Sequence, residues 1–208
     1  MVAALLALMF RVFFFILVER ASILFKALRP QECSIYNPIF WSHERYWKLA
    51  VLSRHLSFLN GTPFKRLVWR LLGVQIGKRI FDDGCIITEK TMVSIGDYCT
   101  LNAGSVIQGH SQEDGGFKSD YITIGAGCTL GVNSLVHYGA TVGDGAQLAA
   151  DAFLMKGEEV PPHTWWGDNP AMEVQDYTLT GAAKTAVGQQ KLEGKPDSEN
   201  YNPIKQAA

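Results

Sequence analysis

The stretch IGAGCTLGVNSLVHYGATVGDGA, from Ile124 to Ala146, repeats its pattern every six residues. An apolar residue opens each hexad, a small residue usually stands four positions later, and glycine often follows the apolar residue directly. The apolar positions of the series are Ile95, Leu101 and Ile107 before an interruption, and Ile124, Leu130, Val136, Val142, Leu148, Leu154, Val160 and Trp166 after it. Such an internal repeat decides a fold before any local propensity does.

A period of six fits neither an amphipathic α-helix, which needs 3.6 residues per turn, nor a coiled-coil heptad. It fits short strands, whose side chains alternate with period two, joined by turns that glycine and small residues permit. Three hexads close one triangular coil, and stacked coils bury a shared apolar column. The sequence therefore predicts an all-β repeat domain of about five coils over residues 74–174.

The cysteines fit this structural interpretation. Cys85, Cys99 and Cys128 lie in or near the small positions of the repeat, where a thiol packs as a small hydrophobe. The four cysteines of the chain form no C-x-x-C pair and no zinc-type spacing. We therefore predict no metal site, and the free thiols favour a reducing, cytosolic side.

Composition divides the chain into four regions. The 208 residues are 47% hydrophobic and carry a formal net charge of −1, which does not favour a nucleic-acid partner. We predict a membrane helix or anchor at 1–29, a helical connector at 30–73, the repeat domain at 74–174 and a flexible tail at 175–208.

The first region is almost wholly apolar from Val2 to Val18, with Arg11 as its single charge. Seventeen residues lie at the short limit for a membrane span, and a signal sequence or a buried helix are the alternatives. Basic residues follow the apolar run, so we expect the repeat domain to face the cytoplasm at the inner or plasma membrane.

The connector carries two helix signals. Ser42 is the expected N-cap of a helix to about Leu56, and Thr62-Pro63 is the expected start of a helix that ends near Gly73. Many aromatic residues in this region suit packing against the first coil, a membrane interface, or both.

Three features together resemble the bacterial hexapeptide-repeat acyltransferases over residues 76–174. They are the repeat quoted above, a polar loop that interrupts it beginning at His110, and the closing WWGDNPA of residues 165–171. The resemblance implies a left-handed parallel β-helix, which the period alone does not show. It also implies a homotrimer, or a pseudo-trimer of tandem domains, because the loop then frames an active site against a neighbouring copy.

A narrower resemblance concerns LNGTPFKRLVWRLLGVQIGKRIFDDGC (59–85), GSVIQGHSQEDGGFKSD (104–120) and FLMKGEEVPPHTWWGDNPA (153–171). These segments are similar to the membrane-linked terminal region of non-ribosomal peptide synthetases of the poly-lysine synthetase type. Several such domains occur in one chain there, and one is visible here.

His110 stands where the period stops and matches the family's catalytic histidine. Imidazole titrates near neutral pH, so it can remove a proton from an attacking hydroxyl or amine. The resemblance implies that the loop from Ser111 to Tyr121 shapes the acceptor end of the site. We expect His110 to lie at the surface, so that its replacement by alanine costs little stability.

The resemblance assigns further residues to substrates. Asp82 and Glu89 align with acceptor-contacting positions, but this alignment crosses a slip in the register of the repeat, and surface solvation is the better explanation of both. Ala150 and Lys156 match the groove for the pantetheine arm, and Asn169 and Pro170 match the terminal turn beside it. The donor is then an acyl-CoA or a carrier-bound phosphopantetheine thioester, with no permanently bound cofactor.

Three classes of function can be compared with these motifs. An acyltransferase acting on an O or N acceptor agrees best with the motifs. A β-helical carbonic anhydrase needs histidines closer in sequence than His110, His137 and His163, and the latter two are expected to be structural. The remaining alternative is a non-catalytic, membrane-tethered assembly module of a peptide synthetase.

Overall fold

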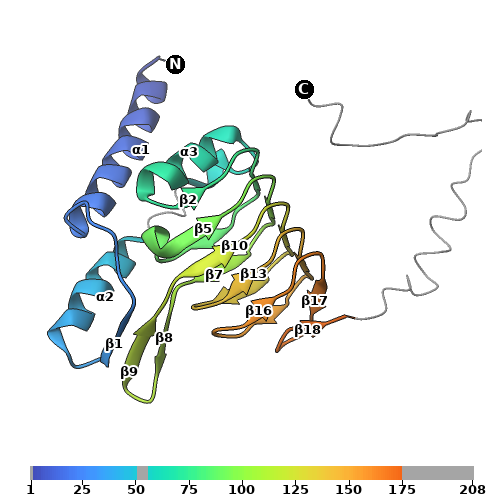
Figure 1. Cartoon of the computed structure of the whole chain (residues 1–208). Helices are drawn as coiled ribbons and strands as arrows, with labels where there is room; N and C mark the ends of the chain where they lie inside the picture. Colours follow the sequence, from blue (N-terminus) through green and yellow to red (C-terminus); the bar gives the residue numbers. More distant parts are fainter. Residues whose placement is uncertain (1, 51–55, 175–208) are drawn as a thin grey trace, which may run out of the picture. The chain divides into compact units, whose positions relative to one another are not determined.

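A computed structural model describes residues 2–50 and 56–174 of the chain. The predicted tail at 175–208 lies outside these described residues. The repeats form three sheets of parallel strands that wind into stacked coils, and each coil takes one strand from each sheet (Figure 1).

The strands are short because each covers one side of a coil. The first sheet contains β2 (Gln75–Ile76), β5 (Val93–Ile95), β10 (Ile122–Ile124), β13 (Thr141–Val142) and β16 (Glu159–Val160). The second contains β3 (Phe81–Asp82), β6 (Thr100–Leu101), β11 (Thr129–Leu130), β14 (Gln147–Leu148), β17 (Trp165–Gly167) and β18 (Met172–Glu173). The third contains β4 (Ile86–Ile87), β7 (Val106–Gln108), β12 (Leu135–His137) and β15 (Phe153–Leu154).

The six-residue period is confirmed as the inward-facing set of the coils. Leu101, Leu130 and Leu148 stack in register along the second sheet and are at most 2% exposed. Cys85, Cys99 and Cys128 are buried free thiols beside the same column, as the sequence predicts. Burial of this continuous apolar surface stabilises coils that could not be stable singly.

The sequence predicts that Ile76, Ile80, Ile86 and Met92 continue the period before Ile95, with a one-residue slip between Thr88 and Ser94, and the register of the first coil differs from this. Asp82, not an apolar residue, pairs with Leu101, and Ile87, not Ile86, pairs with Ile107. Asp82 lies six residues after Ile76 and so keeps the period, whereas the step from Asp82 to Ile87 is one residue shorter than that from Leu101 to Ile107 and turns Ile87, not Ile86, inward. The step to the next coil is longer, because the short 3₁₀ helix η2 (Lys90–Met92) follows β4.

Three helices surround the first coil. They are α1 (Val2–Ser22), α2 (Pro38–Ala50) and α3 (Pro63–Leu72). Thr62 is the N-cap of α3, as predicted, and Gly73 ends it with a φ of 110°, which favours glycine. The predicted start of α2 at Ser42 is wrong: Asn37 Oδ1 accepts a hydrogen bond from Ile39 N at 2.9 Å, and the helix begins at Pro38.

Both ends of the column are covered. At the first coil, Gly61 N donates to Asp82 O at 2.7 Å, and the Arg66 side chain donates to Gly77 O. At the last coil, β18 pairs antiparallel with β17, and Ala171 N donates to Phe153 O at 2.7 Å. The outermost strands therefore use some of their backbone groups within the chain.

The interrupting loop is a β-hairpin of β8 (His110–Glu113) and β9 (Gly116–Ser119). It leaves the side of the column, and β1 (Gln31–Ser34) pairs antiparallel with β9 (Figure 1). Phe117 of the hairpin contacts Phe40 of α2, with ring centroids 5.4 Å apart. The wall that the sequence assigns to a neighbouring copy is thus provided, at least in part, by β1 and α2 of the same chain.

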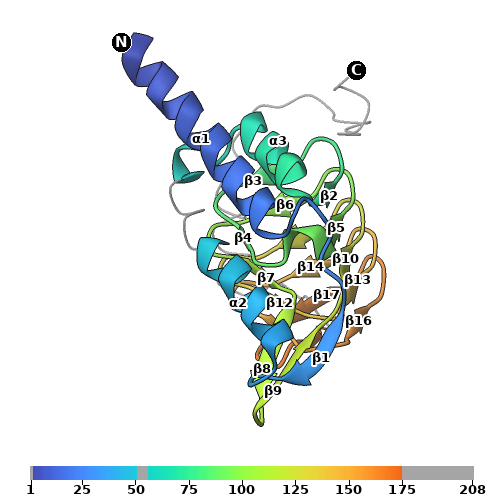
Figure 2. The same cartoon turned by 90° about the vertical axis from the view of Figure 1, so that its left-hand side faces the viewer.

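Helix α1 has two different halves. Val12, Phe15 and Ile16 pack against the core cluster, while the N-terminal end of α1 projects past α3 and the coils (Figures 1 and 2). Its apolar window has a mean hydropathy of 2.4 and is only 6% buried. By length and composition alone, α1 could cross a membrane.

Candidate active site

Glu89 lies at the corner between β4 and η2 and is fully buried. Its Oε1 accepts hydrogen bonds from His110 Nδ1 at 2.8 Å and from His43 Nε2 at 3.0 Å. Its Oε2 accepts from Gly109 N at 2.8 Å and from the Thr88 hydroxyl. A Cβ at Gly109 would lie 2.8 Å from Oε2, so this close approach of backbone and carboxylate requires glycine.

These donors determine the charge of Glu89. Burial by itself would raise the pKa of the carboxyl, but the hydrogen bonds from His110 and His43 outweigh burial and lower the pKa well below its usual value. Glu89 is therefore a carboxylate at neutral pH. The predicted surface location of Glu89 is wrong, and its contact with an acceptor stays a prediction.

His110 is buried, with 6% of its surface exposed, so the expected surface location is also wrong. Its ring lies between Phe117, Trp47 and His43, with centroids 5.8, 5.5 and 5.8 Å away. The hairpin and α2 close over the ring. Nδ1 bonds to Glu89, and Nε2 makes no hydrogen bond to any residue that the structure describes.

The carbonyl of His110 is fixed as well. Gln108 Nε2 donates to it at 3.0 Å, and His137 Nε2 lies 3.1 Å from it. Burial lowers the pKa of His137, so this imidazole is neutral near pH 7 and its Nε2 carries the proton given to the carbonyl. His137 is buried at its repeat position, which agrees with the structural role expected for it, and His163 is exposed.

The residue after Glu89 forms a second buried ion pair. Lys90 Nζ lies 2.8 Å from Glu19 Oε1 of α1, and both side chains are at most 1% exposed. Tyr46 of α2 donates its hydroxyl to Glu19 at 3.3 Å. We call Glu19, His43, Tyr46, Glu89, Lys90 and His110 the polar cluster. It links α1 and α2 to the first two coils.

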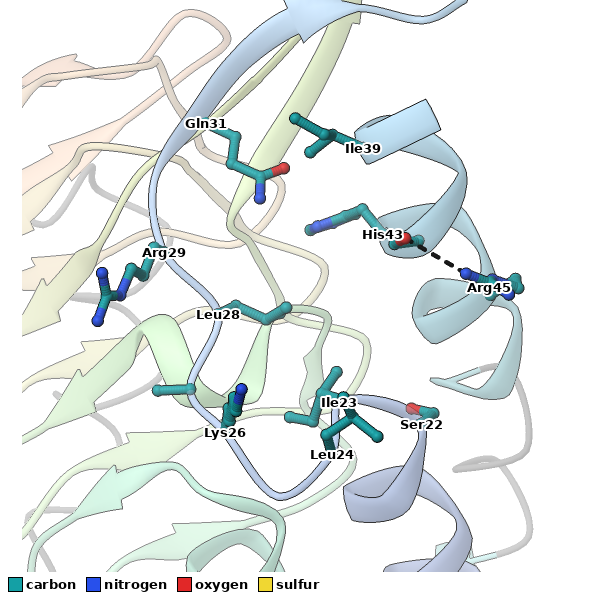
Figure 3. Close-up of a pocket in the computed structure, with 12 residues that line it drawn as sticks. Ser22, Ile23, Leu24, Lys26, Leu28, Arg29, Gln31, Ile39, His43 and Arg45 are labelled. Carbon is teal, nitrogen blue, oxygen red and sulfur yellow. Dashed lines mark hydrogen bonds between the residues drawn. The ribbon is translucent and has the colours of Figure 1, made fainter. Parts of the chain in front are cut away.

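A pocket of about 860 Å³ opens on one side of this cluster, between the segment 22–31 and α2. In Figure 3, Leu28 and Gln31 of the segment face Ile39 and His43 of α2 across the space. Gln31 Oε1 is buried and has no hydrogen-bond partner among the described residues. His43 therefore joins the pocket to Glu89, and through Glu89 to His110.

The same three side chains could be considered as metal ligands. Donor atoms of His43, Glu89 and His110 lie within 4.8 Å of one another, and two histidines with a carboxylate suit zinc. Ligands at about 2.0–2.1 Å from a tetrahedral zinc ion stand roughly 3.3 Å apart. Both imidazoles lie closer than that to Oε1, so direct hydrogen bonds account for the arrangement, and the prediction of no metal stays a prediction.

Comparison with known proteins finds a matching repeat family and a relative of this chain. Residues 121–155 match the hexapeptide repeat of succinyl-transferase. A Delta-poly-L-ornithine synthetase from Acinetobacter baumannii is 32% identical over 153 residues. The chain therefore contains the hexapeptide repeat and is similar to the hexapeptide-repeat acyltransferases. The matched segment covers 72% of this chain and 12% of the synthetase, so the chain spans a small part of that relative's length.

Among solved structures, a maltose O-acetyltransferase from Clostridium difficile 630 has a similar fold. The TM-score is 0.50 at 15% identity, and the alignment covers 72% of this chain and 97% of that one. This likeness supports the predicted left-handed parallel β-helix.

The remaining predicted site residues lie elsewhere. Asp82 is 2% exposed, and its oxygens accept from Trp69 Nε1 at 2.5 Å and from Gly84 N and Cys85 N, both at 2.8 Å. These bonds anchor α3 to the first coil. They do not favour an acceptor contact for Asp82, which stays a prediction.

The predicted donor residues are accessible. Ala150, Asn169 and Pro170 are exposed. Lys156 pairs with Glu113 of the hairpin at 2.5 Å. This ion pair raises the pKa of Lys156, so the side chain is a cation in the working pH range. These residues are therefore accessible to a ligand, and their contacts with a pantetheine arm stay predictions.

Sequence reasoning missed His43. In the sequence, His43 directly follows Ser42, the predicted N-cap, and nothing at that position indicates a functional histidine. Its pairing with Glu89 depends on how α2 lies on the hairpin, and the repeat carries no information on that. The alignment signal did select Glu89 and His110 separately, but nothing in the sequence indicated that they touch.

Proposed function

We propose that the chain is an acyltransferase that moves an acyl group, such as an acetyl, aminoacyl or peptidyl group, from a thioester to an O or N acceptor. The donor is an acyl-CoA or a carrier-bound phosphopantetheine thioester. The acceptor heteroatom bonds to the acyl carbon, the C–S bond breaks, the acceptor loses one proton, and the thiolate leaves and is protonated. A thioester is already activated, so the chain must supply orientation and a base.

The observation that carries this proposal is the pairing of His110 with Glu89. The 2.8 Å bond from Nδ1 to a buried carboxylate fixes the ring and assigns its proton to Nδ1. Nε2 is then the basic nitrogen that takes the acceptor's proton. The carboxylate also stabilises the imidazolium that forms. Glu89 is thus a positioning residue in this mechanism.

The pocket beside His43 is a route by which an acceptor reaches this pair. Its wall combines apolar side chains with the cations Lys26, Arg29 and Arg45, and no carboxylate lies among the lining residues that the structure identifies. Such a lining favours an acceptor that carries negative charge. His43 shares Oε1 of Glu89 with His110, so a ligand in the pocket would sense the same charge.

The setting of this activity is also a proposal. We infer attachment to the inner or plasma membrane with the repeat domain in the cytoplasm, supported by α1 and by the basic residues after it. We infer a homotrimer, or tandem domains of a longer protein, from the family resemblance. Light scattering of the active, detergent-solubilised protein tests the trimer, and a fully active monomer would exclude it.

A non-catalytic assembly module of a peptide synthetase is the alternative. The A. baumannii relative is named as a synthetase of poly-ornithine, and the matched part is only 12% of its length. The buried His110–Glu89 pair favours catalysis, because an assembly role does not need a fixed imidazole beside a carboxylate.

The deciding experiment compares His110→Ala, His43→Ala and the exposed control His163→Ala. We expect His110→Ala to lower thioester turnover by about 100-fold or more while CoA binding persists. Because His110 is buried and bonded, we also expect a loss of about 1–3 kcal/mol of stability, in contrast to a surface residue.

Each of the other outcomes has a meaning. We expect His43→Ala to retain more turnover than His110→Ala, and His163→Ala to leave turnover and melting temperature unchanged. If His43→Ala is the more severe variant, the base is His43. If no thioester is consumed by the wild type in the presence of amine and hydroxyl acceptors, the assembly module is favoured.

A further inference from the structure

Helix α1 cannot lie wholly inside a bilayer in this arrangement. Val12, Phe15 and Ile16 are partly buried against the core cluster of the coils, and Glu19 pairs with Lys90 inside the protein. If this half entered the hydrocarbon of the bilayer, the first coil would have to enter with it, because the two pack together. The coil's exposed turns carry charged residues and free backbone groups, which lipid cannot satisfy.

Arg11 gives a second reason. It is exposed and stands at the middle of Val2–Ser22, so a helix spanning with this whole segment would carry a charge at the centre of the bilayer. Before Arg11, the side chains on the projecting end are largely exposed and apolar, with Leu6 at 60%, Met9 at 62% and Phe10 at 66%. Exposed apolar side chains continue past Arg11 at Phe13, Phe14 and Leu17, with exposures of 65%, 52% and 42%, so exposure falls toward the half of α1 that packs on the coils.

Helix α3 presents a matching surface beside α1. Val68, Trp69 and Leu72 face the coils, whereas Phe64, Leu67 and Leu71 are 63%, 50% and 52% exposed. The spacing of three and four residues places the exposed trio on one stripe of the helix. Arg70 is exposed next to this stripe. A helix with apolar and basic arcs of this kind suits the plane of a membrane interface.

We propose that the bilayer surface crosses α1 near Arg11, with the preceding end of α1 in hydrocarbon and α3 lying in the interface. Phe64, Leu67 and Leu71 then enter the boundary of the acyl chains, and Arg11 and Arg70 meet anionic headgroups. The surface is continuous, because α1 and α3 pack side by side and α1 projects past α3 in both views (Figures 1 and 2). This proposal does not depend on acyl transfer.

A depth measurement tests this placement in the full chain. Nitroxide labels at single cysteines, in a Cys33→Ser background with the three buried cysteines kept, report contact with oxygen in lipid and with a nickel chelate in water. The chain is reconstituted in vesicles of zwitterionic and anionic phospholipids. Positions Leu6, Leu17, Leu67 and Leu71 are labelled, and Val132, which is 45% exposed on the coils, is the control.

We expect Leu6 to be deep in lipid, Leu67 and Leu71 to be shallow, and Leu17 and Val132 to remain accessible to the nickel chelate. A depth profile centred on Arg11, with Leu17 as protected as Leu6, would show a spanning helix and overturn the proposal. Aqueous labels at Leu67 and Leu71 would overturn the role of α3. Labels there that are shielded even without lipid, together with a dimer or larger species by light scattering, would show that another copy covers α3.

Glutamate substitutions provide a functional readout. Leu67→Glu with Leu71→Glu leaves the buried face of α3 unchanged, and we expect it to reduce vesicle binding by at least about tenfold with no loss of helical signal. Val132→Glu is the matched control and should bind vesicles as the wild type does. Equal binding of the double variant would contradict the proposal.

Discussion

The apolar column and the polar cluster meet at the first two coils and are built on opposite principles. In the column, an equivalent apolar residue recurs every six positions, and burial of apolar surface stabilises the stack. In the cluster, His43 and His110 share Glu89, Lys90 and Tyr46 share Glu19, and buried charges are tolerated only because they are paired. Each column residue has equivalents in neighbouring coils, whereas the loss of one cluster member leaves a buried polar group without its partner.

The largest expected effect is on the column. Leu130→Asp places an unpaired charge at a position with 0% exposure, so we expect a loss of about 5 kcal/mol or more and no cooperative melting. Val132→Asp, two residues further on the same coil and 45% exposed, is the control and should change stability by about 0.5 kcal/mol or less. Circular dichroism during thermal denaturation measures both. A folded Leu130→Asp protein would show that the column is not the core.

The polar cluster is tested next by Glu89→Gln. The folded-state pKa of Glu89 is lowered, so its stabilising contribution is present above the unfolded value of about 4.3 and is lost as pH falls toward the folded value. We expect the variant to be less stable than the wild type by about 3 kcal/mol at neutral pH, with a smaller difference below about pH 4. Chemical denaturation at several pH values measures this.

The exposed Glu159→Gln variant is the control for this pH series and should follow the wild-type curve. A Glu89→Gln protein that loses equal stability at every pH would show that shape, not charge, makes Glu89 important.

A smaller effect is expected where α3 meets the column. Trp69→Phe removes the donor to Asp82 but leaves the bonds from Gly84 N and Cys85 N. We expect a loss of about 1–2 kcal/mol, because one oxygen of a buried carboxylate loses its partner. Urea denaturation measures the loss, and Phe81→Leu on the exposed side of β3 is a control that should have little effect. A loss as large as that of Leu130→Asp would mean that the packing of the Trp69 indole in the core, not its hydrogen bond, dominates the effect.

The smallest effect on stability is expected for Lys156→Ala. The side chain is exposed, and its ion pair with Glu113 is screened by water, so the melting temperature should not change measurably. If Lys156 contacts the phosphates of the donor, KM for acyl-CoA should rise with kcat unchanged. Lys78→Ala, exposed in the first coil, is the control. An unchanged KM would remove Lys156 from the predicted donor groove.

The sequence allowed the column to be predicted because its period is local and repeated. It also located the start of α3, since Thr62-Pro63 acts within one turn. It did not predict that Ile87 faces inward in place of Ile86, because a single short turn changes the register without changing composition. The burial of His110 could not be predicted, since it depends on α2 and β1, which are remote in sequence and follow no repeat.

The covered ends of the column have a consequence for solubility. A stack of parallel coils ends in strand edges that could accept another copy and grow into a fibre. Here α3 and Gly61 occupy part of the first edge, and β18 with residues 168–171 occupies part of the last. Ala171, which is 2% exposed, folds back against the final coil. Residues 168–173 therefore block part of the last strand edge and hinder end-to-end polymerisation, independently of any part they play in chemistry.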